Sequence, residues 1–216
     1  NVLSRPEYLK NLSENHKIIG ITGTHGKTST TALLSHIFHF NNVNVSYLYG
    51  GITTFNGIGG HYGDPDQPLI LETDEAFNTF EKIKISDLLV LNVDSDHLDY
   101  FKNLDNYRDA FYKVMKNVTD NLVINNDDLN IKAMKELKNP VSYGKDLSAD
   151  FKVQSPGTFL YENNKYEIKS DIIGDHFKSN MLGAIILAFL NGIEIKDSLN
   201  AIESFAGVKR RIELIG

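Results

Sequence analysis

The sequence predicts an α/β protein built on a doubly wound, mostly parallel sheet that is flanked by helices. Short apolar runs, fit for buried strands, alternate along the chain with segments whose apolar residues recur at helical spacing. A turn that contains two glycines joins the first apolar run to the first helical segment. Between residues 150 and 170 the pattern changes to alternating polar and apolar residues, which predicts a small antiparallel β flap.

The first strand and helix are expected after a short polar segment. Residues 1–15 predict a linker or short helix, so the domain itself is expected to cover residues 16–216. Residues 17–21 form an apolar run that is typical of a buried parallel strand. After Thr28 the apolar residues recur at helical spacing, at Leu33, Leu34, Ile37 and Phe38.

Further strands and helices follow in alternation. Strands are predicted at residues 43–48, 69–71, 88–91, 122–124 and 141–143. Helices are predicted at residues 104–118, 175–191 and 196–205. A further helix is predicted directly after residue 128, because Asn126-Asp127-Asp128 is a typical helix cap. The Asn163-Asn164 pair marks the hairpin turn of the flap, and residues 207–216 predict an exit strand. Because ligands of doubly wound sheets gather at the carboxyl ends of the strands, Gly23, Glu72 and Asp94 are expected at one edge.

The composition is that of an ordinary soluble globular protein. The chain has 216 residues, of which 41% are apolar and 23% are charged, and this length suffices to bury a substantial core. The formal net charge of -6 argues against general binding to nucleic acid or to an anionic membrane, because both favour a basic surface. Cysteine is absent, which excludes disulfides, thiolate catalysis and thiolate zinc sites. No signal peptide is recognised and the longest apolar run, residues 184–190, is shorter than a membrane span, so we expect a cytoplasmic protein.

The stretch from Gly20 to Thr31 is expected to bind phosphate. Backbone N–H groups at a helix start point toward an anion, and the helix dipole adds to the attraction. Lys27 can place its charge on the outer phosphates of a nucleotide, and Thr28 can offer its hydroxyl to Mg2+. The glycines depart from the plain Walker spacing, since Ile21 stands where that pattern has glycine. The alternative is a structural turn that ends in a helix cap.

Two acidic stretches follow predicted strands and suit divalent cations. Mg2+ prefers hard oxygen ligands, so Glu72, at the end of one strand, is expected to share the ion with the Thr28 hydroxyl. The stretch from Asn92 to Asp99 suits a second cation, which His97 would bind through a neutral ring nitrogen. The alternatives are a solvated acidic loop for the first stretch and a helix N-cap cluster for the second.

Other polar side chains leave their roles open. His25, inside the glycine-rich turn, either steers a substrate or braces the turn. Asn180 has donor and acceptor groups that suit an adenine edge and Phe177 can pack on a ring, but asparagine early in a helix is also commonly a tolerated polar residue. The basic residues 209–211 form either a phosphate or carboxylate clamp or a solvated exit. Surface or packing positions are expected for His16, His36, His39 and His61.

Four motifs, taken in order, resemble the Mur ligases, the ATP-dependent amide-forming enzymes of peptidoglycan assembly. They are Gly23-Thr-His-Gly-Lys-Thr28, Asn92-Val-Asp-Ser-Asp-His-Leu-Asp99, Gly174-x-His-x-x-x-Asn180 and Phe205-x-Gly-Val-Lys-Arg-Arg211. The resemblance spans essentially the whole chain and is closest to the branch that joins UDP-N-acetylmuramate to L-alanine. Phe177 departs from the family pattern, in which many members have asparagine. Glu72-Thr-Asp-Glu-Ala-Phe77 partly resembles the branch that attaches a whole tripeptide to the same muramate, which is the alternative.

The resemblance implies a P-loop-like central domain that binds ATP and Mg2+. By the same resemblance, the UDP-binding and amino-acid-binding domains of the family lie outside this sequence. The whole enzyme would form an amide through an acyl phosphate, whereas this domain alone is expected to bind nucleotide at best. The nucleotide-binding residues are then expected to be Gly23, Thr24, His25, Gly26, Lys27, Thr28, Ser29 and Asn180.

The resemblance also implies catalytic and metal-binding roles. Lys27 would hold the ATP phosphates. Thr28 and Glu72 would bind the first Mg2+ and His97 the second. Arg211, together with Arg210, would face the transferred phosphoryl group.

Two other classes of function predict different residues. A free-standing P-loop NTPase or kinase would carry a Walker B aspartate directly behind an apolar strand, where this sequence has Glu72. A non-catalytic binding module would be expected to have lost Lys27, Glu72 or His97, and all three are present.

Overall fold

The computed structural model describes residues 4–52, 57–74, 82–94, 103–134, 137–208 and 212–213. Its strands are β1 (Ile18–Thr22), β2 (Ser46–Leu48), β3 (Gly60–His61), β4 (Leu69–Glu72), β5 (Asp87–Val90), β6 (Asn121–Asn125), β7 (Val141–Gly144), β8 (Phe151–Ser155), β9 (Thr158–Tyr161), β10 (Asn164–Glu167), β11 (Gly207–Val208) and β12 (Ile212–Glu213). Its helices are α1 (Arg5–Asn15), α2 (Lys27–Phe40), α4 (Leu104–Lys116), α5 (Leu129–Lys132), α6 (Asp175–Leu190) and α7 (Ile195–Glu203).

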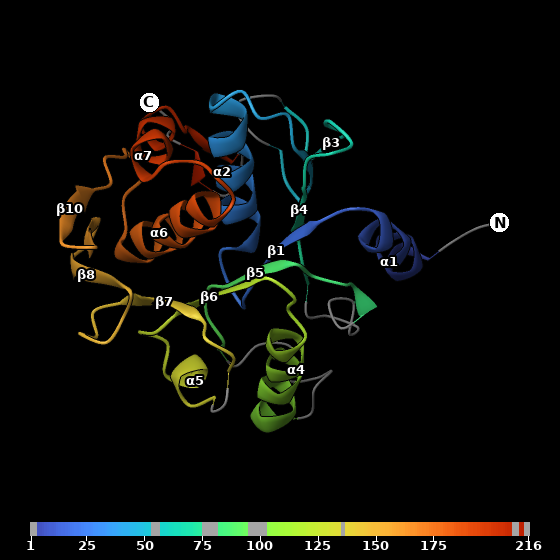
Figure 1. Ribbon diagram of the computed structural model, residues 1–216, viewed down its shortest axis with the longest axis horizontal. Helices are drawn as coiled ribbons and strands as arrows, with labels where there is room; N and C mark the ends of the chain where they lie inside the picture. The colour runs from blue at the N-terminus through green and yellow to red at the C-terminus, as the bar shows by residue number, and fades with distance from the viewer. Residues whose placement is uncertain are drawn as a thin grey trace.

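One sheet of ten strands forms the centre of the fold, in the order β10-β9-β8-β7-β6-β5-β1-β4-β2-β3. The pairs from β8 through to β2 are parallel, whereas β3, β9 and β10 run antiparallel to their neighbours. Helices α2, α6 and α7 cover one face of the sheet, and α4 and α5 cover the other (Figure 1). The predicted doubly wound, mostly parallel α/β fold is therefore confirmed.

Two hydrophobic cores form because side chains alternate between the two faces of each strand. In β1, Ile19 and Ile21 belong to the core under α2, α6 and α7, whereas Ile18 belongs to the core under α4. All five residues of β1 are buried, which explains why its sequence is apolar without polar alternation. Strand β1 thus lies inside the sheet and fixes the position of the loop that follows it.

The strand order reverses at β1. Strand β1 pairs with β4 on one side, with Ile21 opposite Glu72, and with β5 on the other, with Thr22 opposite Val90. The carboxyl ends of β1, β4 and β5 consequently lie together at one edge of the sheet. Ligands of open α/β sheets bind at such a reversal point, so the topology itself indicates where a site belongs.

The predicted flap is antiparallel, and it continues the main sheet. Strand β8 pairs in parallel with β7, with Tyr143 opposite Phe151, and β9 and β10 then extend the sheet as antiparallel strands. Phe151 and Phe159 are buried in the core under α6, which gives the flap a hydrophobic face that a free hairpin would lack. The turn lies at Glu162 and Asn163, which have φ angles of 47° and 66°, one position earlier than the predicted Asn163-Asn164 turn.

The segment before β1 is helical. The Ser4 N–H and hydroxyl donate to the Glu7 carboxylate at 2.8 and 2.7 Å, which forms a capping box at the start of α1. Leu9 is buried in the core under α4, so α1 packs onto the sheet. The boundary of the domain at residue 16 stays a prediction.

Two strands are shorter than the sequence predicts. Strand β2 begins at Ser46 rather than at residue 43, because Asn42 has a left-handed φ of 59° and the Val45 N–H donates to the Val43 carbonyl in a tight turn. The predicted exit strand is a short antiparallel pair formed by β11 and β12.

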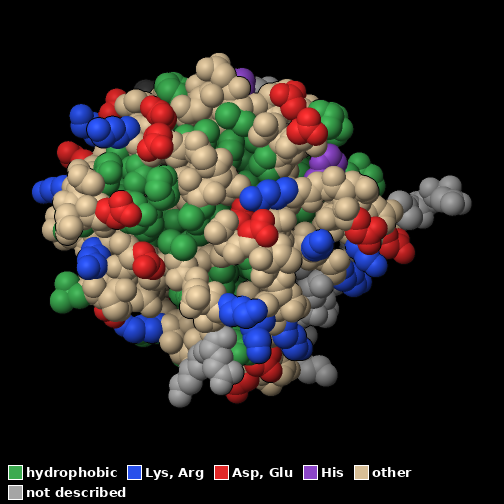
Figure 2. Space-filling model, viewed as in Figure 1, with side chains coloured by type: hydrophobic (Ala, Val, Ile, Leu, Met, Phe, Trp, Pro, Cys, Tyr) green, Lys and Arg blue, Asp and Glu red, His purple; other side chains and the backbone are tan. Residues whose placement is uncertain are grey.

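Acidic and basic side chains are mixed over the face of the molecule that Figure 2 shows. Within the described ranges, no helix has the length and the apolar character needed to cross a bilayer.

Candidate functional site

The loop from Gly23 to Gly26 joins β1 to α2 and requires glycine at both ends. The φ angles of Gly23 and Gly26 are 144° and 87°, in a region that other residues rarely adopt. A Cβ atom on Gly23 would lie 3.0 Å from the Leu91 Cβ and 3.1 Å from the Asn92 backbone, and one on Gly26 would collide with the Asn180 amide. The two glycines therefore let the loop approach both the end of β5 and the start of α6.

The chain that follows β5 holds this loop in shape. Asn92 Oδ1 accepts a hydrogen bond from the His25 N–H at 2.8 Å, and Asn92 Nδ2 donates to the His25 carbonyl at 3.0 Å. The Thr24 N–H also donates to the Asn92 carbonyl at 3.1 Å. The sequence places Asn92 in a stretch expected to bind metal, whereas its observed contacts brace the loop. No sequence signal indicates this role, because the two partners follow different strands and are 67 positions apart in the sequence.

Thr24 anchors the loop from inside the protein. Its hydroxyl accepts a hydrogen bond from the Asp94 N–H at 2.8 Å and lies 3.0 Å from the hydroxyl of Tyr107, a fully buried residue of α4. Because the side chain of Thr24 takes part in this network, its backbone is what the loop presents to a ligand.

Lys27 holds a positive charge over the loop. Its Nζ donates to the Gly23 carbonyl at 2.7 Å and to the Thr24 carbonyl at 3.4 Å. Lys27 is also the first residue of α2, whose N-terminal N–H groups and dipole favour an anion at the same place. The ammonium group, the helix N-terminus and the glycine-rich backbone therefore suit a phosphate group together.

Thr28 and Glu72 meet at the carboxyl edge of the sheet. The Thr28 hydroxyl donates to Glu72 Oε1 at 2.7 Å, and the Gly50 N–H donates to Glu72 Oε2 at 2.7 Å. Among the described residues Glu72 forms no ion pair, so neutral donors alone face its negative charge. Hydroxyl and carboxylate oxygens are the ligands that Mg2+ prefers, so these two side chains fit a Mg2+ ion beside the phosphate loop.

A pocket of about 600 Å³ opens beside the loop. Its lining residues come from the loop, the first turn of α2, the end of β5 and the first turns of α6; they are His25, Gly26, Ser29, Asn92, His176, Phe177 and Asn180. Asn180 lies against Gly26, and the ring centroids of His176 and Phe177 are 4.0 Å apart. The pocket thus brings together four of the residues that the sequence assigns to nucleotide binding, namely His25, Gly26, Ser29 and Asn180.

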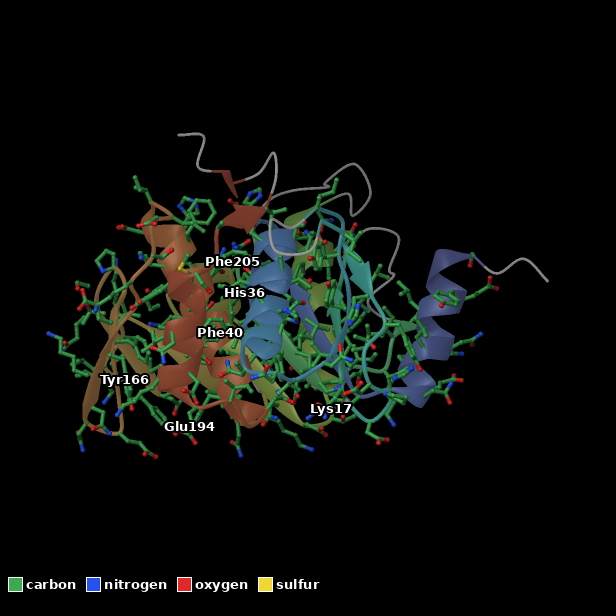
Figure 3. All side chains as sticks on the ribbon, turned by 90° about the horizontal axis from the view of Figure 1, so that it is seen from above. Lys17, His36, Phe40, Tyr166, Glu194 and Phe205 are labelled. Carbon is green, nitrogen blue, oxygen red and sulfur yellow. The ribbon has the colours of Figure 1, made fainter. Side chains whose placement is uncertain are left out.

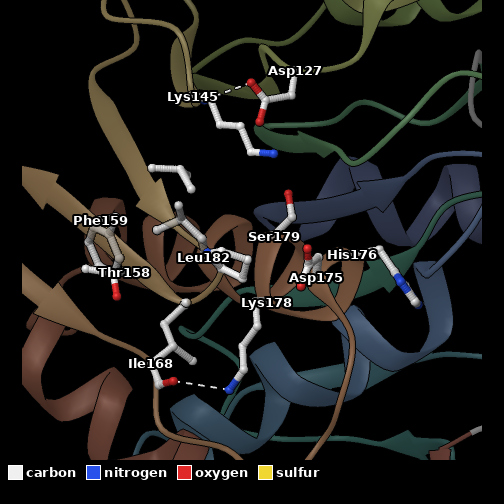
Figure 4. A pocket seen from close by; sticks show the side chains of 13 residues that line it. Asp127, Lys145, Thr158, Phe159, Ile168, Asp175, His176, Lys178, Ser179 and Leu182 are labelled. Carbon is white, nitrogen blue, oxygen red and sulfur yellow. Dashed lines mark hydrogen bonds between the residues drawn. The ribbon is translucent and has the colours of Figure 1, made fainter.

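A second pocket, of about 200 Å³, lies between the flap and α6 (Figure 4). Lys178 is one of the residues that line this pocket, and the Lys178 Nζ donates to the carbonyls of Ile168 at 3.1 Å and Ser170 at 3.3 Å. Burial lowers the pKa of Lys178, because removal from water disfavours the charged ammonium form. His176 borders both pockets, so the start of α6 separates them.

His36, on α2, contacts α7 and the residues that directly follow it (Figure 3). Its Nε2 lies 3.0 Å from the Ala201 carbonyl and 3.0 Å from the Ser204 hydroxyl. Its ring centroid is 6.1 Å from that of Phe40 and 5.4 Å from that of Phe205. Burial lowers the pKa of His36, and its predicted packing role is confirmed.

Three predicted site residues, His97, Arg210 and Arg211, lie outside the described residues, and their roles stay predictions. In the part of the chain that the structure does describe, no group of three or more His, Cys, Asp or Glu side chains is placed to hold a metal ion. The structure therefore describes the first predicted metal site, at Thr28 and Glu72, whereas His97 of the second lies outside the described residues.

Comparison with known families matches residues 21–188 to the Mur ligase middle domain. Over 230 residues the chain is 35% identical to the UDP-N-acetylmuramate--L-alanine ligase of Clostridium botulinum, covering 100% of this chain and 50% of that protein. It is 32% identical over 228 residues to the protein of the same name from Dictyoglomus turgidum, covering 100% and 49%. The chain spans about half the length of the curated relatives it matches.

Solved structures show the same fold. The UDP-N-acetylmuramate-alanine ligase of Thermotoga maritima has a TM-score of 0.82 and 26% identity, covering 98% of this chain and 50% of that one. A UDP-N-acetylmuramate:L-alanyl-gamma-D-glutamyl-meso-diaminopimelate ligase from Neisseria meningitides has a TM-score of 0.83 and 24% identity, covering 96% and 72%. At 24% identity, the similarity to the Neisseria protein supports the fold alone.

Proposed function

Since the chain belongs to the Mur ligase middle-domain family, we propose that it is the ATP-binding central domain of a ligase that joins UDP-N-acetylmuramate to L-alanine. The whole ligase would form this amide through an acyl phosphate during the synthesis of peptidoglycan precursors, in the cytoplasm. The curated relatives that bear this name support the proposal, because they match the chain over its full length. The UDP-binding and amino-acid-binding domains are proposed to lie in other parts of the same protein, since the chain spans about half of these relatives.

The observation that carries the proposal is the loop at the carboxyl end of β1. Gly23 and Gly26 give it its shape, and the Lys27 ammonium group lies over it, 2.7 Å from the Gly23 carbonyl. The adjoining pocket of about 600 Å³ has room for the rest of a nucleotide. The residues proposed to contact ATP are Gly23, Thr24, His25, Gly26, Lys27, Thr28, Ser29 and Asn180.

Thr28 and Glu72 are proposed to bind one Mg2+ and His97 a second. The contact between the Thr28 hydroxyl and Glu72 supports the first assignment, because two hard oxygen ligands already lie next to the loop. When bound, ATP supplies the phosphoryl group that activates the muramoyl carboxylate, and Mg2+ offsets the charge of its phosphates.

The chemical obstacle in this reaction is electrostatic, because a carboxylate and a triphosphate repel each other. Lys27 keeps a positive charge at the loop, held by backbone carbonyls and already oriented before a substrate arrives. Glu72 keeps a negative charge that no cation of the described chain balances, which suits it to a metal ion. Arg210 and Arg211 are proposed to face the transferred phosphoryl group and to absorb its charge.

The runner-up is the central domain of the ligase that attaches a whole tripeptide to the same muramate. The stretch from Glu72 to Phe77 favours it in part. Both proposals share the ATP site and the acid substrate, and they differ in the amine, which a different domain would bind. A stand-alone P-loop NTPase is a third alternative, and the match to the Mur ligase family over residues 21–188 argues against it.

Calorimetric titration with a non-hydrolysable ATP analogue, with and without Mg2+, tests the nucleotide site in this chain. We expect Mg2+-dependent binding that Lys27→Ala abolishes, and we expect no ligation by this chain alone. In the whole ligase, comparison of L-alanine with the tripeptide as the amine decides between the two proposals. Alanine-dependent release of ADP by the 216-residue chain would contradict the proposal that another domain supplies the amine.

A further inference from the structure

The pocket beside the loop has two ends with different chemistry. His25, Gly26 and Ser29 belong to the loop and to the first turn of α2, where phosphate groups are proposed to lie. Both the oxygen and the nitrogen of the Asn92 side-chain amide already form hydrogen bonds with the His25 backbone. The lining residues that remain for a nucleobase are His176, Phe177 and Asn180, all on the first turns of α6.

His176 and Phe177 give this base end an aromatic wall. Their ring centroids are 4.0 Å apart with an interplanar angle of 44°, and the Phe177 side chain is half-buried. Aromatic rings stack on any nucleobase, because every base has a π face, so stacking gives affinity with little base selectivity. The phenylalanine ring also has no hydrogen-bond donor or acceptor with which to distinguish two purines.

The Asn180 amide is the polar group of α6 that faces the loop from this end. It lies against Gly26, and in the part of the chain that the structure describes it makes no hydrogen bond. A carboxamide carries one acceptor and one donor group and can turn by about 180° about its last bond, so it can pair with the amino edge of adenine or with the carbonyl edge of guanine. Discrimination of about 10⁴–10⁵ requires a site whose fixed polar groups are left unpaired by the wrong substrate. The Asn180 amide can turn, and the His176 imidazole can donate or accept according to its tautomer, so neither is a fixed polar group of that kind.

We propose that this domain binds purine nucleoside triphosphates with little preference between adenine and guanine, because Phe177 stacks on the base and Asn180 pairs with either edge. This inference rests on the proposed nucleotide-binding function and adds to it the selectivity of the base end. We expect the dissociation constants of ATP and GTP to agree within about tenfold, far from the factor of about 10⁴ that a site of fixed hydrogen bonds would give.

The test is a set of calorimetric titrations of this chain with ATP, GTP and inorganic tripolyphosphate, each with Mg2+. Tripolyphosphate reports on the loop alone, and we expect it to bind roughly 5- to 150-fold more weakly than ATP, which corresponds to the loss of one stacked base. ATP binding at least about a hundredfold tighter than GTP would overturn the inference while leaving the nucleotide site in place. Failure of all three ligands to bind would overturn the proposed function, and the inference with it.

Variants of Phe177 separate stacking from phosphate binding. Phe177→Ala should weaken ATP and GTP by the same factor, roughly 5- to 150-fold, and leave tripolyphosphate unchanged. If Phe177→Ala does not fold, Phe177→Leu replaces it in the test. Leucine keeps most of the apolar volume but has no ring, so the same pattern of affinities is expected. Phe40→Ala, an exposed aromatic at the other end of α2, is the matched control and should change none of the three affinities. Unchanged ATP affinity in a folded Phe177 variant would contradict the inference.

Discussion

Two carboxylates, on the strands that flank β1 and at opposite ends of the sheet, have different partners. Asp87, at the start of β5, is fully buried and lies 3.0 Å from the Lys17 ammonium group, at the end of the sheet away from the loop. Its other oxygen accepts hydrogen bonds from the Asn121 N–H at 3.1 Å and the Asn121 side-chain amide at 2.6 Å. Glu72, at the end of β4, accepts hydrogen bonds from the Thr28 hydroxyl and the Gly50 N–H.

The difference between the two carboxylates is the presence of a cation. Lys17, which also lies 3.7 Å from the Asp120 carboxylate, forms an ion pair with Asp87, so the chain itself supplies a cation for this buried carboxylate. Among the described residues no cation balances Glu72, although its hydrogen bonds fix its position just as firmly. A carboxylate that is oriented but not neutralised indicates a cation site, whereas one that is oriented and neutralised indicates a structural role. The following substitutions test this distinction.

The largest effect is expected at the carboxyl end of the sheet. In the whole ligase, Lys27→Ala should slow ligation by at least about a hundred- to a thousandfold, or roughly 3–4 kcal/mol of barrier, because it removes a preoriented charge from the phosphate loop. Steady-state assays of ADP release measure this rate. Lys17→Ala, at the other end of the same strands, is the matched control and should leave the rate nearly unchanged. Near-normal turnover by Lys27→Ala would exclude the proposed role of Lys27.

Asp87→Ala should instead affect stability. It removes the acceptor of the Asn121 side-chain amide and the nearer of the two carboxylates beside Lys17, which should lower the free energy of unfolding by about 3 kcal/mol. Urea titration measures this loss. Nucleotide affinity, measured below the unfolding transition, should stay the same. A loss of affinity in the folded variant would mean that the two ends of the sheet are coupled.

Glu72→Gln should lower nucleotide affinity and leave stability nearly unchanged, which is the opposite of Asp87→Ala. The amide keeps the shape of the side chain and can still accept from the Thr28 hydroxyl or the Gly50 N–H, so stability should change by less than about 1 kcal/mol. The Mg2+-dependent part of nucleotide affinity should fall by about tenfold or more, since the charge that binds the ion is gone. Titrations with and without Mg2+ separate the two quantities. Equal Mg2+ dependence in Glu72→Gln and the parent chain would refute the metal site.

The smallest effect concerns His36, which lies away from both carboxylates. Because burial lowers the pKa of His36 in the folded state, the unfolded chain takes up a proton first as the pH falls below about 6.5, and stability falls with it. Well above that pH, His36 is neutral in the folded and the unfolded state, so it does not make the free energy of unfolding depend on pH. His36→Gln should therefore flatten the fall in unfolding free energy between about pH 7.5 and pH 5.5. Urea titrations at several pH values across this range measure the slope, and an equal slope in His36→Gln and the parent chain would contradict the prediction.

The central part of the fold could be predicted from the sequence because its signals are local. The run predicted at residues 17–21 corresponds to the fully buried β1, shifted by one residue, and the apolar spacing after Thr28 corresponds to α2. The Asp128 cap of α5 follows from the same kind of signal, since its carboxylate accepts from the Asn130 and Ile131 N–H groups. These features depend on residues that are neighbours in the chain.

The supports of the site could not be predicted, because they join residues far apart in the sequence. Thr24 meets Tyr107 across 83 positions, and His25 meets Asn92 across 67. The Gly50 N–H that orients Glu72 carries no sequence signal, since any residue except proline offers such a group. The parallel pairing of β8 with β7 also depends on tertiary packing, because an alternating pattern predicts a strand and not its neighbour.

The two hydrogen bonds between Asn92 and residue 25 join an amide to main-chain atoms only. The curvature of the turn is thus independent of which side chain position 25 carries. A protein built this way can exchange an imidazole there for another group and tune the chemistry of the pocket that residue 25 lines, while the backbone beneath stays the same.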